Sequence, residues 1–114
     1  MDDPHYRHGI ELFNAGRFFD AHEELEDAWR VAAEDDRLFL QGLTQAAVGL
    51  HHHSCGNRTG ACSVLERARG NLGGYPARYA GIRVEELRQA LGAFSAALLA
   101  CEAAPPVPRI EWAE

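Results

Sequence analysis

The sequence predicts an all-α fold, a compact bundle of about five helices with a buried central helix near residues 37–55 and an extended, proline-rich C-terminal tail. Apolar residues recur at helical spacing in several segments, and glycines and prolines separate these segments. The run 38–57 contains no Asp, Glu, Lys or Arg, which is typical of a helix surrounded by others. No alternating strand pattern competes with this interpretation.

The first helix is expected to begin after Asp3, an N-cap residue followed by Pro4 at the first helical position. It should end near Ala15, because Gly16 follows. The apolar stripe of this helix consists of Tyr6, Ile10 and Phe13.

The second and third helices are expected to be antiparallel neighbours. The second should run from about residue 17 to residue 33, where the acidic residues 34–36 break it. The uncharged third helix then begins near Arg37 and stops at Gly56 and Asn57. The connection is short, so the two helices should pack side by side in opposite directions.

The C-terminal half predicts two more helices and a tail. A fourth helix from about 59 to 72 ends at a Gly-Gly pair, and a loop to Gly81 carries the aromatic pair Tyr75 and Tyr79. A fifth helix from about 84 to 101 has a stripe of Leu87, Leu91, Phe94 and Leu98. Three prolines then end regular structure, and the tail with Ile110 and Trp112 either covers the bundle or reaches a second subunit.

Composition bounds the domain organisation and the function. The 114 residues, 46% of them hydrophobic, suit one helical domain over residues 1–104 followed by the tail 105–114. The net charge of -6 argues against a nucleic-acid partner, which needs clustered cations. All eleven cations are Arg, and the absence of Lys excludes Schiff-base chemistry, a Lys general base and a Walker-type phosphate loop.

The cysteines and the uncharged run indicate where the chain resides. The three cysteines are an odd set without a C-x-x-C pair, which favours a reducing, cytoplasmic setting over a disulfide framework. The uncharged run is about long enough to span a bilayer, but its glutamines and histidines would be costly in lipid. We therefore expect a soluble bundle and no membrane partner.

Polar side chains on the second helix point to a candidate site. At about 100° per residue, His22 and Glu26 lie in the middle of the apolar face, with Glu23 at its edge. Glu24 and Asp27 fall on the far side and are expected to face solvent.

The third helix carries a matching row of Gln41, Gln45 and His52. If the two helices are antiparallel, these rows should meet, which predicts one cluster of His22, Glu26, Gln45 and His52. Successive helical residues diverge by about 100°, so the neighbours His51 and His53 are expected to be packing or surface residues.

Three interpretations of this site remain open. It can be a buried polar network that sets which helix faces meet. It can hold a divalent metal through Glu23, Glu26 and one or both of His22 and His52, and activate a water for hydrolysis. It can also be a metal-free acid-base site that uses Glu23 or Glu26. The order His-Glu-x-x-Glu is not the zincin pattern, which needs a second His where Glu26 stands.

Three blocks of sequence resemble the domain-of-unknown-function 309 family. They are the segment 18–29 with its His-Glu-x-x-Glu-x-x-Trp core, the segment 39–52 with Phe-Leu-Gln-Gly-Leu and a His pair, and Gly-Asn-x-x-Gly-Ala at 56–61. The resemblance extends from Phe13 to about Leu72. It implies a small all-α bundle in a family that is sometimes described as predicted metal-dependent hydrolases, and it makes dimers unsurprising. The matching motif positions are His22, Glu23, Glu26, Trp29, Gln41, Gln45, His52 and Asn57.

The working hypothesis is a metal-dependent hydrolase acting on an unidentified small molecule. Its catalytic residues would be Glu23 and Glu26, its metal ligands His22, Glu26 and His52, and its binding residues Trp29, Gln41, Gln45 and Asn57. The rival is a non-catalytic structural or protein-interaction module, such as a homodimer, in which the cluster is a polar network.

Overall fold

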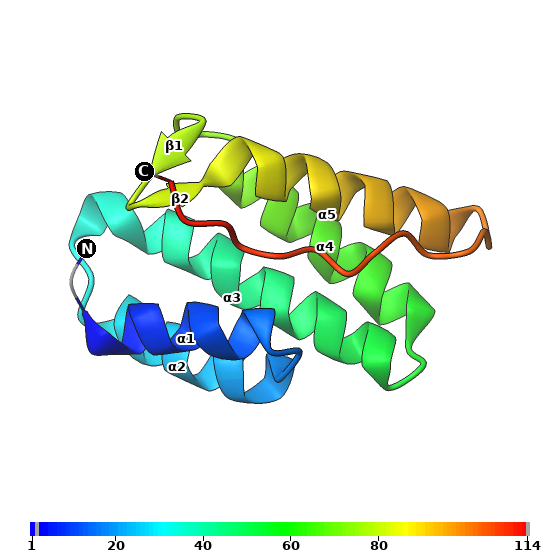
Figure 1. Cartoon of the computed structure of the whole chain (residues 1–114), viewed down its shortest axis with the longest axis horizontal. Coiled ribbons are helices and arrows are strands. Elements are labelled where there is room, and N and C mark those ends of the chain that lie inside the picture. The colour runs from blue at the N-terminus through cyan, green and yellow to red at the C-terminus, as the bar shows by residue number, and fades with distance from the viewer. Residues whose placement is uncertain (2, 114) are drawn as a thin grey trace.

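The protein is an α-helical bundle with one small hairpin, as the computed structural model of residues 1 and 3–113 shows. In chain order its elements are α1 (Pro4–Asn14), α2 (Phe18–Arg30), α3 (Glu34–Ser54), α4 (Arg58–Leu72), β1 (Arg78–Tyr79), β2 (Ile82–Arg83) and α5 (Val84–Leu99). The pair α1 and α2 lies on one side of α3, and the pair α4 and α5 lies on the other (Figure 1). The all-α prediction and the central position of α3 are confirmed.

The helix ends follow capping chemistry, with one correction. The Asp3 carboxylate accepts a hydrogen bond of 2.7 Å from the backbone N–H of His5, as expected for an N-cap. The acidic residues 34–36, expected to break the second helix, instead form the first turn of α3, and α2 ends at Arg30. Acidic side chains are favourable in a first turn, where they face the positive end of the helix dipole.

Small residues bring α3 and α4 close together. A Cβ atom added to Gly42 would lie 2.9 Å from the side chain of Leu72, and one added to Gly49 would lie 2.7 Å from that of Leu65. Both leucines are fully buried. The contact therefore requires glycine at these two positions of α3.

The hairpin contradicts the expectation that the chain has no strands. β1 and β2 pair antiparallel, and the two residues between them, Ala80 and Gly81, have φ angles of 50° and 81°. Positive φ at both central residues is the requirement of a type I′ hairpin turn. Strands of two residues are too short to show an alternating pattern, so periodicity could not predict them.

The aromatic pair of the preceding loop is half-buried, with the rings of Tyr75 and Tyr79 4.8 Å apart. The Tyr75 hydroxyl accepts a 3.0 Å hydrogen bond from the backbone N–H of Phe39 and donates one of 2.8 Å to the carbonyl of Asp35. The Tyr79 hydroxyl donates to the carboxylate of Asp36, which raises the pKa of Tyr79 to about 12. These bonds attach the loop to the first turns of α3.

The tail folds back along the bundle from the end of α5 to the hairpin (Figure 1). The backbone N–H of Arg83 donates to the carbonyl of Glu111 at 2.9 Å, and the side-chain amide of Asn14 bonds both backbone groups of Ile110. The Trp112 ring stands edge-on to the Tyr6 ring at 6.2 Å. The tail thus covers the bundle, one of the two roles expected for it.

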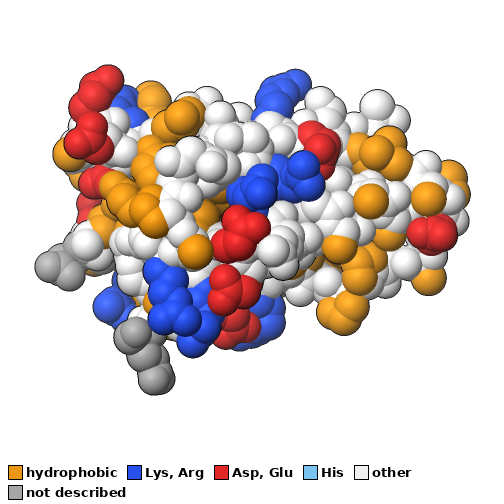
Figure 2. All heavy atoms as spheres, turned by 90° about the horizontal axis from the view of Figure 1, so that it is seen from above, with side chains coloured by type: hydrophobic (Ala, Val, Ile, Leu, Met, Phe, Trp, Pro, Cys, Tyr) orange, Lys and Arg blue, Asp and Glu red, His pale blue; other side chains and the backbone are white. Residues whose placement is uncertain are grey.

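The stripe predicted for the fifth helix is buried in α5 at all four positions. On the face of the molecule that includes α5, acidic and basic side chains lie next to one another and apolar side chains form separate small patches (Figure 2). Among the helices of the described residues, none combines the length and apolarity that crossing a membrane requires.

Replacing Gly49 by Ala is predicted to lower the free energy of unfolding by about 1–3 kcal/mol, because the new methyl group would collide with the buried Leu65. The matched control is Gly70→Ala in α4, where an added Cβ meets nothing within 4 Å. Both variants gain helix propensity, so the control should gain roughly 0.5–1 kcal/mol. Denaturant unfolding measures the free energy of unfolding of both variants. A change of the same sign in the two variants would contradict the close contact.

Replacing Trp112 by Ala is predicted to lower the free energy of unfolding by about 1–2 kcal/mol, less than a fully buried Trp would cost, because the side chain is 38% exposed. The loss comes from its contacts with Tyr6 and with the Arg7 guanidinium, 5.0 Å from the Trp112 ring centre. Leu99→Ala, at a leucine that is 70% exposed, should change it by less than about 0.5 kcal/mol. Equal thermal melting of the two variants would show that the tail is not anchored through Trp112.

Candidate functional site

The antiparallel helices α2 and α3 share an open surface that carries several of the predicted site residues. We call it the α2–α3 face and define it by seven residues, namely Phe19, His22, Glu26, Trp29, Gln41, Thr44 and His51. The Phe19 ring lies 5.3 Å from the His22 ring and 5.5 Å from the His51 ring. Further along, Glu26, Trp29, Gln41 and Thr44 line one hollow. The face is half-exposed rather than buried.

Within this face, His22 and Glu26 are brought together. The Nδ1–H of His22 donates to the carbonyl of Phe19 at 3.0 Å, and its Nε2 lies 3.4 Å from a carboxylate oxygen of Glu26. The other Glu26 oxygen accepts from Arg30 at 3.2 Å. Their side chains are 24% and 43% exposed, so this pair is not the buried charge pair that the sequence suggested.

The structure does not bring together the four residues of the predicted cluster, because Gln45 and His52 lie away from His22 and Glu26. The amide oxygen of Gln45 accepts a 2.7 Å hydrogen bond from Asn71 in α4, and His52 lies 3.3 Å from the amide nitrogen of Asn57. Both side chains are therefore directed to the α4 side and not to α2. The prediction of one cluster was wrong because α3 packs on two sides and its apolar residues do not single out one face. Leu38, an apolar residue near the start of α3, is 48% exposed.

The other two histidines at the end of α3, and Asn57, have structural contacts. His51, expected to face another helix or solvent, is the α3 histidine that meets α2. His53 packs edge-on against Phe94 of α5, with ring centres 4.9 Å apart. Asn57 caps α4 by accepting a 2.9 Å hydrogen bond from the backbone N–H of Gly60.

The hollow on the α2–α3 face is small and has a cation above its aromatic wall. Its volume is about 220 Å³, below the roughly 300–1,000 Å³ that is usual for small-molecule pockets. The Arg37 guanidinium carbon lies 4.0 Å from the centre of the Trp29 ring, a cation–π contact. Glu23 lies outside this hollow, exposed, and lines a separate one that includes His8 and Arg17.

Sequence reasoning missed a second polar group on the opposite side of α2. Glu24 and Asp27 were expected to face solvent, but α1 covers this side of the helix. The Nδ1 atoms of His5 and His8 lie 2.8 and 2.5 Å from the two carboxylate oxygens of Glu24. The hydrogen bond to Glu24 raises the pKa of His5, and the hydrogen bonds from His5 and His8 lower the pKa of Glu24.

The spacing of these four residues in the sequence could have predicted this second group. His5 and His8 are three residues apart, as are Glu24 and Asp27, so each pair lies on one face of its own helix. Potential ligand atoms of His5, Glu24 and Asp27 all lie within 4.8 Å of one another. The arrangement can attract a cation, since it gathers imidazole nitrogens and carboxylate oxygens at one point.

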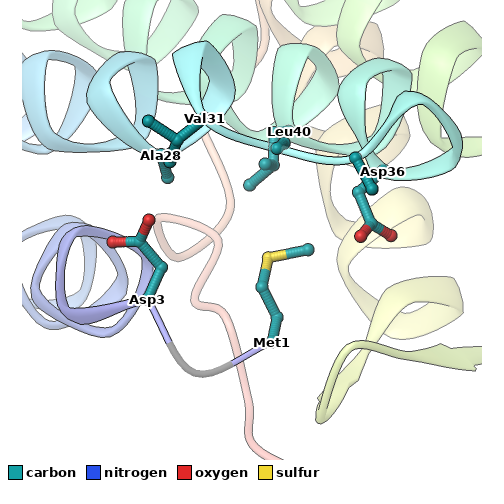
Figure 3. A pocket seen from close by; sticks show the side chains of 8 residues that line it. Met1, Asp3, Ala28, Val31, Asp36 and Leu40 are labelled. Carbon is teal, nitrogen blue, oxygen red and sulfur yellow. The ribbon is translucent and has the colours of Figure 1, made fainter.

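A third hollow lies between the start of α1, the end of α2 and the start of α3, and the carboxylates that line it already make structural hydrogen bonds. Figure 3 shows the Met1 side chain reaching into it between Asp3 and Asp36, below Leu40. Asp3 accepts from the N–H of His5 and Asp36 accepts from the Tyr79 hydroxyl. Its two carboxylates therefore already hold helix and loop ends in place.

Comparison with known proteins places the chain in a family. An uncharacterized protein of Aquifex aeolicus (strain VF5) is 31% identical over 77 residues, which are 67% of this chain and 23% of that protein. The chain thus matches less than a quarter of the length of this relative. The model of the domain of unknown function DUF309 matches residues 6–64, more than half of the chain, which covers α2, α3 and α1 from Tyr6 onward and leaves His5 just outside the match. The chain therefore belongs to the DUF309 family, as its motifs predicted.

Proposed function

We propose that the chain is a non-catalytic protein-interaction module that associates with a second copy of itself through the α2–α3 face. The observation that carries this proposal is that the motif residues of this face stand half-exposed on one surface. Packing does not require an aromatic or a charged side chain at such positions. Side chains of this kind on an open surface are typical of a binding face.

Two aromatic residues supply the anchors of the proposed interface. Phe19 is 52% exposed, and Trp29 is partly exposed with its ring held by the Arg37 guanidinium. Trp, Tyr and Arg are the residues that most often dominate binding energy at protein interfaces. A Trp that is held in place before binding loses little conformational freedom when the partner arrives.

The α2–α3 face and the residues that border it carry charges of both signs, which is why the proposed partner is a second copy. Glu26 lies beside Arg30, and Arg37 lies beside Trp29. In a two-fold dimer each patch meets itself in reverse, so a carboxylate of one copy can face a guanidinium of the other. The Aquifex relative supports the idea of a module, because the matching segment is 23% of its length.

Metal-dependent hydrolysis of a small molecule, in a cytoplasmic setting, is the second candidate function. The hollow lined by Glu26, Trp29 and Gln41 favours it, since three predicted site residues share one concave surface. The proposed ligands do not fit as a set, however. Among the described residues, the atoms of three potential ligands come within 4.8 Å at His5, Glu24 and Asp27, and not at His22, Glu26 and His52.

The interaction proposal predicts that the wild-type chain dimerises and that Phe19→Glu weakens the dimer by at least about tenfold, because a charge replaces an aromatic anchor. Sedimentation equilibrium over a concentration series measures this dissociation constant. Leu99→Glu is the matched control, since Leu99 is 70% exposed at the end of α5, outside the face. Circular dichroism confirms that both variants fold.

A wild-type chain that stays monomeric, or a Phe19→Glu variant that dimerises as tightly as wild type, would contradict the proposal. Hydrolase function would gain support from turnover of a model ester or phosphodiester that is lost in Glu26→Gln. Measuring turnover and dimerisation on the same samples separates the two candidate functions.

A further inference from the structure

Helices α1 and α2 place two histidines opposite two carboxylates. His5 and His8 belong to α1, Glu24 and Asp27 belong to α2, and the members of each pair are separated by three residues. This is the spacing by which helical bundles direct several metal ligands to one point. The group lies on the α1 side of α2, so it shares no side chain with the α2–α3 face.

We propose that His5, Glu24 and Asp27 form a binding site for a divalent transition-metal ion of the Zn²⁺ type. His8 orients the Glu24 carboxylate through a hydrogen bond to its other oxygen. Imidazole nitrogen and carboxylate oxygen are donors that Zn²⁺ accepts together. The proposal concerns metal binding and does not depend on the proposed function of the α2–α3 face.

The distances are close to those of a bound ion. With bonds of about 2.0–2.2 Å, neighbouring ligand atoms of a tetrahedral zinc site stand roughly 3.3–3.5 Å apart. The His5 nitrogen and the Glu24 oxygen are 2.8 Å apart, and the three ligand atoms of the group lie within 4.8 Å of one another. Moving each side chain by about 1 Å therefore reaches the required geometry. The ion takes the position of the hydrogen on His5 Nδ1, and the imidazole then carries its hydrogen on Nε2.

The exposure of the ligands makes this adjustment inexpensive. The side chains of His5, His8 and Asp27 are 48%, 55% and 41% exposed. Asp27 is paired with Arg30, but an exposed ion pair is worth little in water, so it does not block the site. Glu24 is held best, at 23% exposure, because His8 bonds the oxygen that His5 leaves free. A second contact of this kind orients a metal-binding carboxylate. The outward side stays open for a water ligand.

A metal at this position would add coordinate bonds between two helices that His5 and His8 already join to Glu24 by hydrogen bonds. His5 and Glu24 are 19 residues apart in sequence, so the ligands converge only in the folded chain. An ion that binds the folded state stabilises it by mass action. At a concentration of roughly 100 times the dissociation constant, the melting temperature should rise by about 10 °C.

The test compares two carboxylates of one helix. Protein without an affinity tag is titrated with ZnCl₂ at neutral pH by calorimetry, and its melting temperature is measured with ZnCl₂ and with EDTA. Wild type should bind one ion per chain, Glu24→Gln should weaken binding at least about tenfold, and Glu26→Gln should leave it unchanged. Because His5 is exposed, His5→Gln serves as a second loss variant that should fold normally.

The His51-His52-His53 segment is an independent zinc ligand source, so His52→Gln is the second control and should bind like wild type. Loss of binding in Glu26→Gln or His52→Gln, together with retention in Glu24→Gln, would overturn the proposal and place the ion at the motif residues. The absence of stoichiometric binding, or a melting temperature of wild type that ZnCl₂ does not raise, would also overturn it. Dimerisation of the α2–α3 face is measured separately, so failure of one proposal leaves the other standing.

Discussion

The close contact between α3 and α4 is the constraint on which the rest of the structure depends. Gly42 and Gly49 leave room for the buried side chains of Leu72 and Leu65, and a larger residue at either position would push the two helices apart. The contact also sets the rotation of α3 about its axis. With its glycines turned to α4, α3 presents Gln41, Thr44 and His51 to the α2 side. The composition of the α2–α3 face is therefore a consequence of packing on the other side of the helix.

The start of α3 is a second point where distant segments meet. Tyr75 and Tyr79, from the loop before α5, bond to the first turn of α3 and pack on Phe39 at 5.4 and 5.1 Å. The hairpin that follows pairs with the tail through Arg83 and Glu111. Residues from the loop, the hairpin and the tail thus converge on the end of the bundle at which α3 begins. The Tyr75 hydroxyl bridges the Asp35 carbonyl and the Phe39 N–H, two backbone groups of α3 that are four residues apart.

Most of the fold could be predicted from local signals, because caps and helix-breaking residues act within a few positions. Asp3, Pro4 and the Gly-Gly pair at 73–74 marked helix ends to within a residue or so. The acidic turn 34–36 was misassigned because the same residues are acceptable both in a loop and in a first helical turn. The rotation of α3 about its axis could not be predicted from a run that is apolar on several sides. For this reason Gln45 and His52, which were expected beside His22, instead contact Asn71 and Asn57.

The position of α2 between α1 and α3 explains why its polar motif was hard to interpret. A helix packed on two sides has two polar edges, and the His-Glu-x-x-Glu spacing describes only one of them. His22 and Glu26 follow the α3 side, whereas Glu24 and Asp27 follow the α1 side and meet His5 and His8 there. Glu24 is the less exposed of the two glutamates, at 23% against 43% for Glu26. An ion is attracted to the place where donors converge and water is partly excluded, and in this bundle that place is the α1 side of α2.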